Sequence, residues 1–172
     1  LYRKRSKNPI NVLYDHIVVT DINEDNTNYE LERQIATICT NQVPGTLPFY
    51  TGYNPDTKFH FAGIDVNEKN LTRYYNKEKP LGYIYVQPHE DNFFKVSRLV
   101  DTSNWSKFFL TDKSTEGLGQ GKIHDRDLFY SMPLNTAIIS TTGYAGSNSP
   151  SEEDDRDGAN TSSSASSIPG ET

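Results

Sequence analysis

The stretches Lys58-Phe59-His60-Phe61 and Tyr83-Ile84-Tyr85-Val86 decide the fold class of this 172-residue chain. In the first, polar side chains alternate with phenylalanines, and in the second, tyrosines alternate with aliphatic side chains. Successive side chains of a strand point to opposite faces of a sheet, so both patterns are typical of strands. Other short runs rich in β-branched and aromatic residues are bounded by Gly, Pro, Asn or Asp, which is typical of strands separated by turns. The sequence therefore predicts strands over residues 10–20, 47–53, 59–66, 81–86, 93–100, 107–110, 127–130 and 137–144.

Only residues 29–38 favour a helix. Leu31, Ile35 and Ile38 recur at a spacing that would place them on one helix face. Residues 26–28 precede this stretch and contain asparagines that could cap a helix. Together with the strand pattern, this predicts a mainly β fold, an antiparallel β-sandwich or a partly open barrel with one short helix.

The composition changes along the chain and predicts three parts. Residues 1–8 are rich in Lys and Arg and are predicted to be a basic N-terminal arm or a juxtamembrane segment. Residues 9–144 contain the strand patterns and are predicted to be a β-rich globular domain. Residues 145–172 are rich in Ser and acids and poor in apolar residues, so they are predicted to be a disordered acidic tail.

The basic residues near the start of the chain favour a position close to a membrane surface. Arg3, Lys4, Arg5 and Lys7 resemble the basic flank on the cytoplasmic side of a membrane-spanning helix, so we expect membrane proximity through these four residues. The expected location is that of a membrane-tethered soluble domain, on either the cytoplasmic or the exported side. The formal net charge of −6 disfavours binding of nucleic acid through the main fold, because such binding requires cations against phosphates.

The loop over residues 21–32 resembles an EF-hand calcium loop at its first, third, fifth and twelfth positions, which are Asp21, Asn23, Asp25 and Glu32. Calcium prefers several oxygen ligands, and these side chains could supply them. The loop departs from the pattern at Asn26, where a glycine is usual. Ca²⁺ is therefore the only cofactor that the sequence suggests, and the alternative is an acidic connection without a metal. The single cysteine, Cys39, excludes a cysteine-rich zinc site.

Aromatic residues provide the other candidate site. Tyrosine offers rigid contact area with a polar hydroxyl, so clustered tyrosines can line a binding face. The candidates are Tyr50, Tyr53, Tyr74 and Tyr75. The alternative is that these rings fill the core and the cross-strand pairs of a β fold.

No complete catalytic motif is visible in the sequence. His89 and His124 have acidic neighbours, but they could act as acids or bases only in a site assembled by the fold. The sequence therefore predicts a non-enzymatic interaction domain of a membrane-associated or surface protein, which binds a protein or glycan partner through aromatic and acidic loops. The alternatives are a structural subunit of a viral or cellular assembly and an enzyme whose site forms only in the fold.

Overall fold

Antiparallel strands form nearly all the regular structure of the domain. The computed structural model describes residues 1–10, 12–113, 115–117 and 119–134. Within these residues there are nine strands and one 3-10 turn, η1 (Thr72–Tyr74). The strands are β1 (Tyr2–Ser6), β2 (His16–Val19), β3 (Tyr29–Gln34), β4 (Thr46–Asn54), β5 (Phe59–Gly63), β6 (Gly82–Tyr85), β7 (Phe94–Asp101), β8 (Asn104–Thr111) and β9 (Lys122–Ser131).

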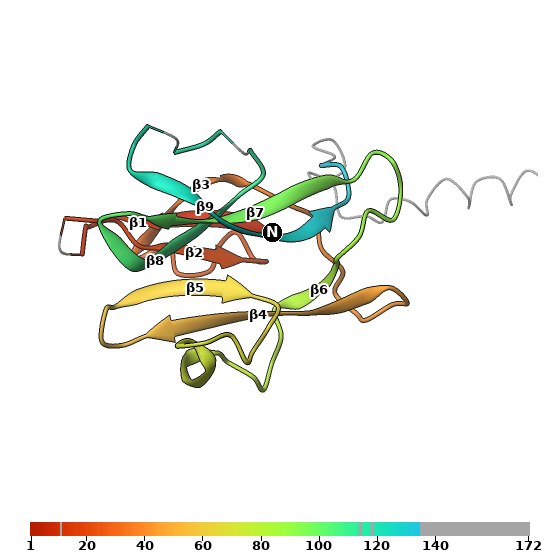
Figure 1. Ribbon diagram of the computed structural model, residues 1–172, viewed down its shortest axis with the longest axis horizontal. Coiled ribbons are helices and arrows are strands. Elements are labelled where there is room, and N and C mark those ends of the chain that lie inside the picture. Colours follow the sequence, from red (N-terminus) through yellow and green to blue (C-terminus); the bar gives the residue numbers. More distant parts are fainter. Residues whose placement is uncertain (11, 114, 118, 135–172) are drawn as a thin grey trace, which may run out of the picture. The chain divides into compact units, whose positions relative to one another are not determined.

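The strands are arranged in two sheets within residues 1–133. A three-stranded sheet has the order β2-β1-β3, and a six-stranded sheet has the order β5-β4-β6-β9-β7-β8. In Figure 1, β4 and β5 lie in the lower layer and β7, β8 and β9 lie in the upper layer. The sheets do not close into a barrel, and the predicted mainly β fold, consistent with a sandwich, is confirmed. No helix among the described residues is long and apolar enough to cross a bilayer.

The predicted helix over residues 29–38 is wrong, because Tyr29–Gln34 form β3. Cross-strand ion pairs explain the error: Glu30 accepts a hydrogen bond from Arg5, and Glu32 accepts one from Arg3. Leu31, which was expected on the apolar helix face, is 44% exposed. Pairing with β1 therefore outweighs the helical spacing of the apolar residues, since local propensity is a weak determinant of structure.

The segment predicted to be a basic arm is instead part of the fold over Tyr2–Ser6. These residues form β1, the central strand of the small sheet, and the side chains of Arg3 and Lys4 are buried. Arg3 pairs with the carboxylates of Glu32 and Glu116, and Lys4 donates hydrogen bonds to oxygens of the loop after β2. The predicted strand over residues 137–144 and the predicted tail over residues 145–172 lie outside the described residues.

Apolar side chains form two packed clusters. The larger cluster contains residues of β4, β6, β7, β8 and β9 and of the segment after β3, among them Ile35, Phe49, Ile84, Val96 and Phe129. The smaller cluster consists of Phe61, Tyr75, Val100 and Phe108. Large buried aromatic rings supply much of the apolar area in a chain that is only 34% hydrophobic.

Arg98 of β7 is a buried cation beside the smaller cluster. Its guanidinium forms ion pairs with Glu68 and with Asp125, the latter at 2.7 Å. It also donates a hydrogen bond of 3.0 Å to the carbonyl oxygen of Ala62 and lies 4.5 Å from the centroid of the Phe108 ring. The guanidinium therefore has polar partners along its edge and an aromatic ring over a face, and the residue ties the segment before η1 to β5, β7 and β9.

Candidate functional site

The tyrosines predicted to form a binding face lie in different environments. Tyr75 is buried, and its hydroxyl donates a hydrogen bond of 2.7 Å to Glu68. Tyr50 and Tyr74 are partly buried against the same aromatic cluster. Tyr53 is 41% exposed and packs against a histidine ring, His60, at a centroid distance of 4.5 Å. Three of the four rings therefore contribute to packing, and partner binding through them stays a prediction.

The predicted calcium loop holds a different cation, the ammonium of Lys4. Its Nζ donates hydrogen bonds to the carbonyl oxygens of Ile22 and Glu24, at 3.2 and 2.5 Å, and to Oδ1 of Asn26, at 2.6 Å. The lysine therefore binds oxygens of residues at the second, fourth and sixth positions of the loop, which are not the four predicted calcium ligands.

The four predicted calcium ligands do not converge. Asp21 accepts a hydrogen bond from the backbone of Asn23, as in an ordinary turn, and Asp25 lies further along the same loop. Glu32 instead pairs with Arg3, the neighbour of the lysine in β1, and successive strand residues face opposite ways. Within the described part of the chain, no group of three or more His, Cys, Asp or Glu side chains could hold a metal ion.

A cavity of about 250 Å³ lies between β1, β2, β8 and the connection that follows β8. It is lined by charged residues from all of these elements. Its charged lining residues, together with one histidine, are Arg3, Arg5, His16, Glu32, Asp101, Lys107, Glu116 and Lys122. We call this the Lys107 cavity.

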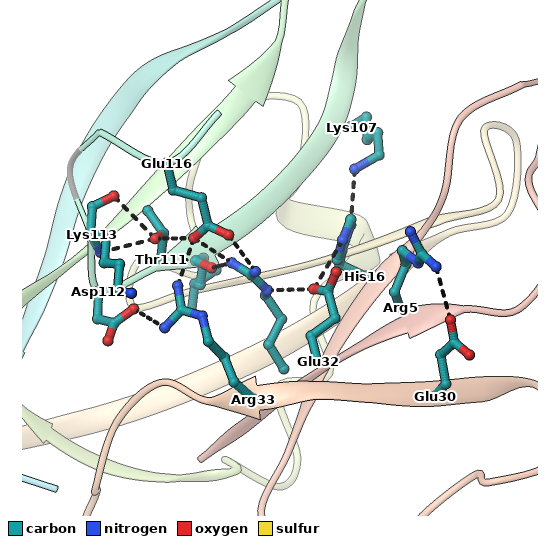
Figure 2. Close-up of polar contacts among 12 residues, drawn as sticks. Arg5, His16, Glu30, Glu32, Arg33, Lys107, Thr111, Asp112, Lys113 and Glu116 are labelled. Carbon is teal, nitrogen blue, oxygen red and sulfur yellow. Dashed lines mark hydrogen bonds and ion pairs between the residues drawn. The ribbon is translucent and has the colours of Figure 1, made fainter. Parts of the chain in front are cut away.

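A chain of polar contacts crosses this cavity from Lys107 to Glu32 (Figure 2). Nζ of Lys107 lies 3.0 Å from Nδ1 of His16, and Nε2 of the same ring lies 3.3 Å from Oε1 of Glu32. A lysine ammonium can only donate hydrogen bonds and an ionised carboxylate can only accept them. The imidazole is therefore neutral, with its proton on Nε2 and its acceptor lone pair on Nδ1 facing the lysine.

The lowered pKa of His16 agrees with that assignment. Burial and the nearby charge of Lys107 lower the pKa of His16, despite the opposing effect of Glu32. Burial alone would raise the pKa of Glu32, but its contacts with His16 and Arg3 lower it to about 2. At neutral pH the contacts therefore join an ammonium, a neutral imidazole and a carboxylate.

A second network of polar contacts fixes the carboxylate of Glu32. Arg3 donates a hydrogen bond of 2.7 Å to Glu32 and two hydrogen bonds, of 3.0 and 2.6 Å, to Glu116. Glu116 also pairs with Arg33, which binds Asp112 (Figure 2). Burial opposes ionisation, but these contacts lower the pKa of Glu116 to about 2. Arg3 therefore has full compensation and is not available to a ligand.

The ring of Phe109 forms an apolar wall of the site. The ring of His16 stacks on it at a centroid distance of 5.1 Å. Lys107 Nζ lies 5.3 Å from the ring centroid, and Lys122 Nζ lies 5.6 Å from it. The ring face attracts cations, but it supplies much less energy than a carboxylate would.

Lys107 is a buried cation of this cavity that has no carboxylate within ion-pair distance among the described residues. The residue is only 3% exposed, and His16 is its single hydrogen-bond partner among the described residues. Burial and the repulsion of Lys122 lower its pKa from 10.5 to about 8, although Asp15, Asp101 and Glu32 act in the opposite direction. Within the described residues, Lys122 forms no ion pair at 4.0 Å or less.

The structure also brings together Asp15, His60 and Tyr29, which the sequence did not single out as a group. Asp15 is 1% exposed, and its Oδ2 lies 2.5 Å from Nδ1 of His60 and 2.6 Å from the Tyr29 hydroxyl. Burial disfavours the charge, but these hydrogen bonds lower the pKa of Asp15. The group anchors β2 to β5 and β3, and a neighbouring cavity of about 170 Å³ is lined by His60.

The histidines that the sequence suggested for acid–base chemistry lie elsewhere. His124 is exposed and pairs with Asp127 at 2.8 Å. His89 stacks on Tyr85 at a centroid distance of 4.8 Å. Neither histidine lines the Lys107 cavity. The residues that do meet there come from distant parts of the chain, so no local motif could have revealed them.

Comparison of the chain with protein-family models, curated proteins and solved structures found no match.

Proposed function

We propose that this domain is a binding module and that its ligand is a small molecule carrying a carboxylate or phosphate group, which binds at Lys107. The observation that carries the proposal is a buried ammonium with one neutral hydrogen-bond partner, lining a cavity. A charge removed from water destabilises a fold unless an opposite charge compensates it. A ligand anion is the group that would provide this compensation.

The rest of the cavity supports an anion as the ligand. Lys122 adds a second ammonium without an ion-pair partner among the described residues, beside the same Phe109 ring. Of the three carboxylates that line the cavity, those of Glu32 and Glu116 are engaged by Arg3, which reduces their repulsion of an incoming anion, and that of Asp101 accepts two hydrogen bonds from Ser103. A volume of about 250 Å³ suits a ligand of few atoms rather than a polymer.

Inorganic phosphate is a direct probe of this proposal. Phosphate should raise the melting temperature of the wild-type domain in a saturable way, measured against chloride at the same ionic strength, because a ligand that binds only the folded state stabilises it. The Lys107→Met variant should lose this shift. The Lys77→Met variant is the matched control, because Lys77 is exposed and should leave the shift unchanged.

The result that contradicts the proposal is also specific. If Lys107→Met keeps the full phosphate shift, the anion binds elsewhere on the domain. If phosphate gives no more stabilisation than chloride with the wild type, the cavity does not bind this class of anion.

A further inference from the structure

We propose that Lys107 forms an imine with ligands that carry a carbonyl group next to their anionic group, the class represented by 2-oxo acids and by glyoxylate. The inference rests on the proposed anion site and specifies the chemistry that follows binding. A lysine amine attacks carbonyl carbons readily when the lysine is desolvated or lies near another cation. Lys107 meets both conditions, since it is 3% exposed and its ammonium and that of Lys122 lie 5.3 and 5.6 Å from the centroid of the same Phe109 ring.

The contacts of Lys107 supply the proton acceptor that the reaction needs. An ammonium must first lose a proton, and the lone pair on Nδ1 of His16 lies 3.0 Å from Nζ. Such a distance allows direct proton transfer. When His16 takes this proton it becomes an imidazolium, whose Nε2–H faces the carboxylate of Glu32 at 3.3 Å. The carboxylate stabilises the charge that forms on the ring.

Glu32 and Arg3 position this proton acceptor. Arg3 Nε donates a hydrogen bond of 2.7 Å to the same oxygen of Glu32 that faces His16, and Arg3 is only 3% exposed. The stacking of His16 on Phe109 fixes the plane of the imidazole. Nδ1 of His16 is therefore held toward Lys107 from two sides.

The second ammonium explains why the carbonyl compound should be anionic. Lys122 lies beside the same aromatic ring as Lys107, so the carboxylate of a 2-oxo acid can pair with it while the carbonyl carbon faces Nζ of Lys107. A neutral aldehyde would lack this second contact. We therefore expect glyoxylate to react faster at Lys107 than a neutral aldehyde of similar size.

The atoms of the reaction balance without an added oxidant or reductant. His16 removes one proton from the ammonium, and the amine of Lys107 then attacks the carbonyl carbon, so that a C–N bond forms and the carbonyl π bond breaks. One hydrogen moves from nitrogen to the new alkoxide. The imidazolium protonates the resulting hydroxyl, the C–O bond breaks and water leaves. Of the three ammonium hydrogens, two leave in the water and one stays on the protonated imine.

Reductive trapping tests this inference. The intact domain is incubated briefly with glyoxylate and sodium cyanoborohydride, which reduces an imine to a stable carboxymethyl group, and the modified lysines are identified by peptide mass spectrometry. We expect Lys107 to be modified at least tenfold faster than the exposed Lys77, and phosphate to slow the reaction at Lys107 alone. The His16→Gln variant should slow trapping at Lys107, because it removes the proton acceptor at Nδ1.

The outcomes separate this inference from the proposed function. If Lys107 reacts no faster than Lys77 in the wild type, the imine chemistry is wrong, and a saturable phosphate shift in the same preparation would leave the anion site in place. If both the trapping and the phosphate shift are absent, both proposals fail. Trapping in His16→Gln at the wild-type rate would overturn the role given to the imidazole.

Discussion

Arg98 and Lys107 are buried cations on the neighbouring strands β7 and β8, and they differ in whether carboxylates pair with them. Arg98 is 0% exposed and has two carboxylates, a carbonyl oxygen and an aromatic ring as partners. Lys107 is 3% exposed and has an imidazole and an aromatic ring. The first cation is compensated within the fold. The ammonium of Lys107 has N–H groups without a hydrogen-bond partner among the described residues, and it lines a cavity.

This difference suggests a way to distinguish a buried charge that stabilises the fold from one that serves function. Removing one partner from a compensated buried pair destabilises a protein, because the other charge is left buried and unpaired. Removing an uncompensated buried charge should have the opposite effect. Residues that destabilise the fold are typically retained where function requires them. The predictions below test this contrast, beginning with the largest expected effect.

Replacement of Arg98 by Met should destabilise the domain by about 4 kcal/mol, because Glu68 and Asp125 lose their buried partner. The free energy of unfolding in urea measures this. Arg73→Met is the control, since the Arg73 side chain is 76% exposed and its substitution should change stability by less than about 0.5 kcal/mol. A loss below about 1 kcal/mol in Arg98→Met would show that the Arg98 network is not what ties these elements together.

Replacement of Gly63 by Ala should destabilise the domain by about 2 kcal/mol, because the region around Arg98 has no free space. A Cβ at this position would lie 2.1 Å from the Tyr75 hydroxyl and 3.3 Å from Nη1 of Arg98. Thermal unfolding measures the effect. The cost should be smaller in a Tyr75→Phe background, where the hydroxyl is absent. Equal costs in the two backgrounds would contradict this explanation.

Replacement of Glu116 by Gln should destabilise the domain at pH 7 by about 1 kcal/mol, a modest amount because the carboxylate is partly exposed to solvent. The pKa of Glu116 is about 2 in the folded state against an ordinary value of 4.5. Its stabilisation is therefore present above pH 4.5 and is lost as the pH falls toward 2. Unfolding of the wild type and the variant from pH 7 to pH 2 measures the difference.

The difference in unfolding free energy between the wild type and Glu116→Gln should disappear near pH 2. The exposed Glu78→Gln variant serves as the control and should follow the wild type throughout. A gap between Glu116→Gln and the wild type that is as large at pH 2 as at pH 7 would mean that the ionisation of Glu116 does not stabilise the fold.

The sequence predicted the class of the fold but missed two strands. Aromatic and β-branched runs gave the positions of β4 to β8 to within three residues, whereas β9 begins five residues before the predicted strand and β2 occupies only the later part of the strand predicted over residues 10–20. It missed β1 and β3 because their residues are charged or spaced like a helix. Antiparallel backbone pairing forms these strands, and Arg3 and Arg5 pair with Glu32 and Glu30 across it. That pairing joins residues that are far apart in the sequence.

The candidate site could not be predicted from the sequence for a similar reason. His16, Glu32 and Lys107 belong to β2, β3 and β8, and no spacing rule relates them. One signal was present: Lys107 begins the apolar run Lys107-Phe108-Phe109-Leu110, in which a charged residue is unexpected. The loop that resembled a calcium site contacts the ammonium of Lys4 through oxygens of Ile22, Glu24 and Asn26, which are not the predicted calcium ligands, so the resemblance did not reveal this contact.

The most direct test of the central claim is the free energy of unfolding of the wild type, Lys107→Met and the control Lys77→Met, measured without added phosphate between pH 7 and pH 10.5. The pKa of Lys107 falls from 10.5 to about 8 on folding, so its buried charge should cost about 3 kcal/mol at pH 7. Between pH 8 and pH 10.5 the folded state loses this proton while the unfolded state keeps it, so the stability of the wild type should rise in this window relative to the variant. The charged and titratable groups near Lys107 that influence this titration are His16, Lys122, Asp15, Asp101 and Glu32.

We predict that Lys107→Met is about 2 kcal/mol more stable than the wild type at pH 7, that the gap narrows toward pH 10.5, and that Lys77→Met follows the wild type. If Lys107→Met is instead less stable than the wild type at pH 7, Lys107 is a compensated structural charge like Arg98, and the account of a ligand site at this residue is contradicted.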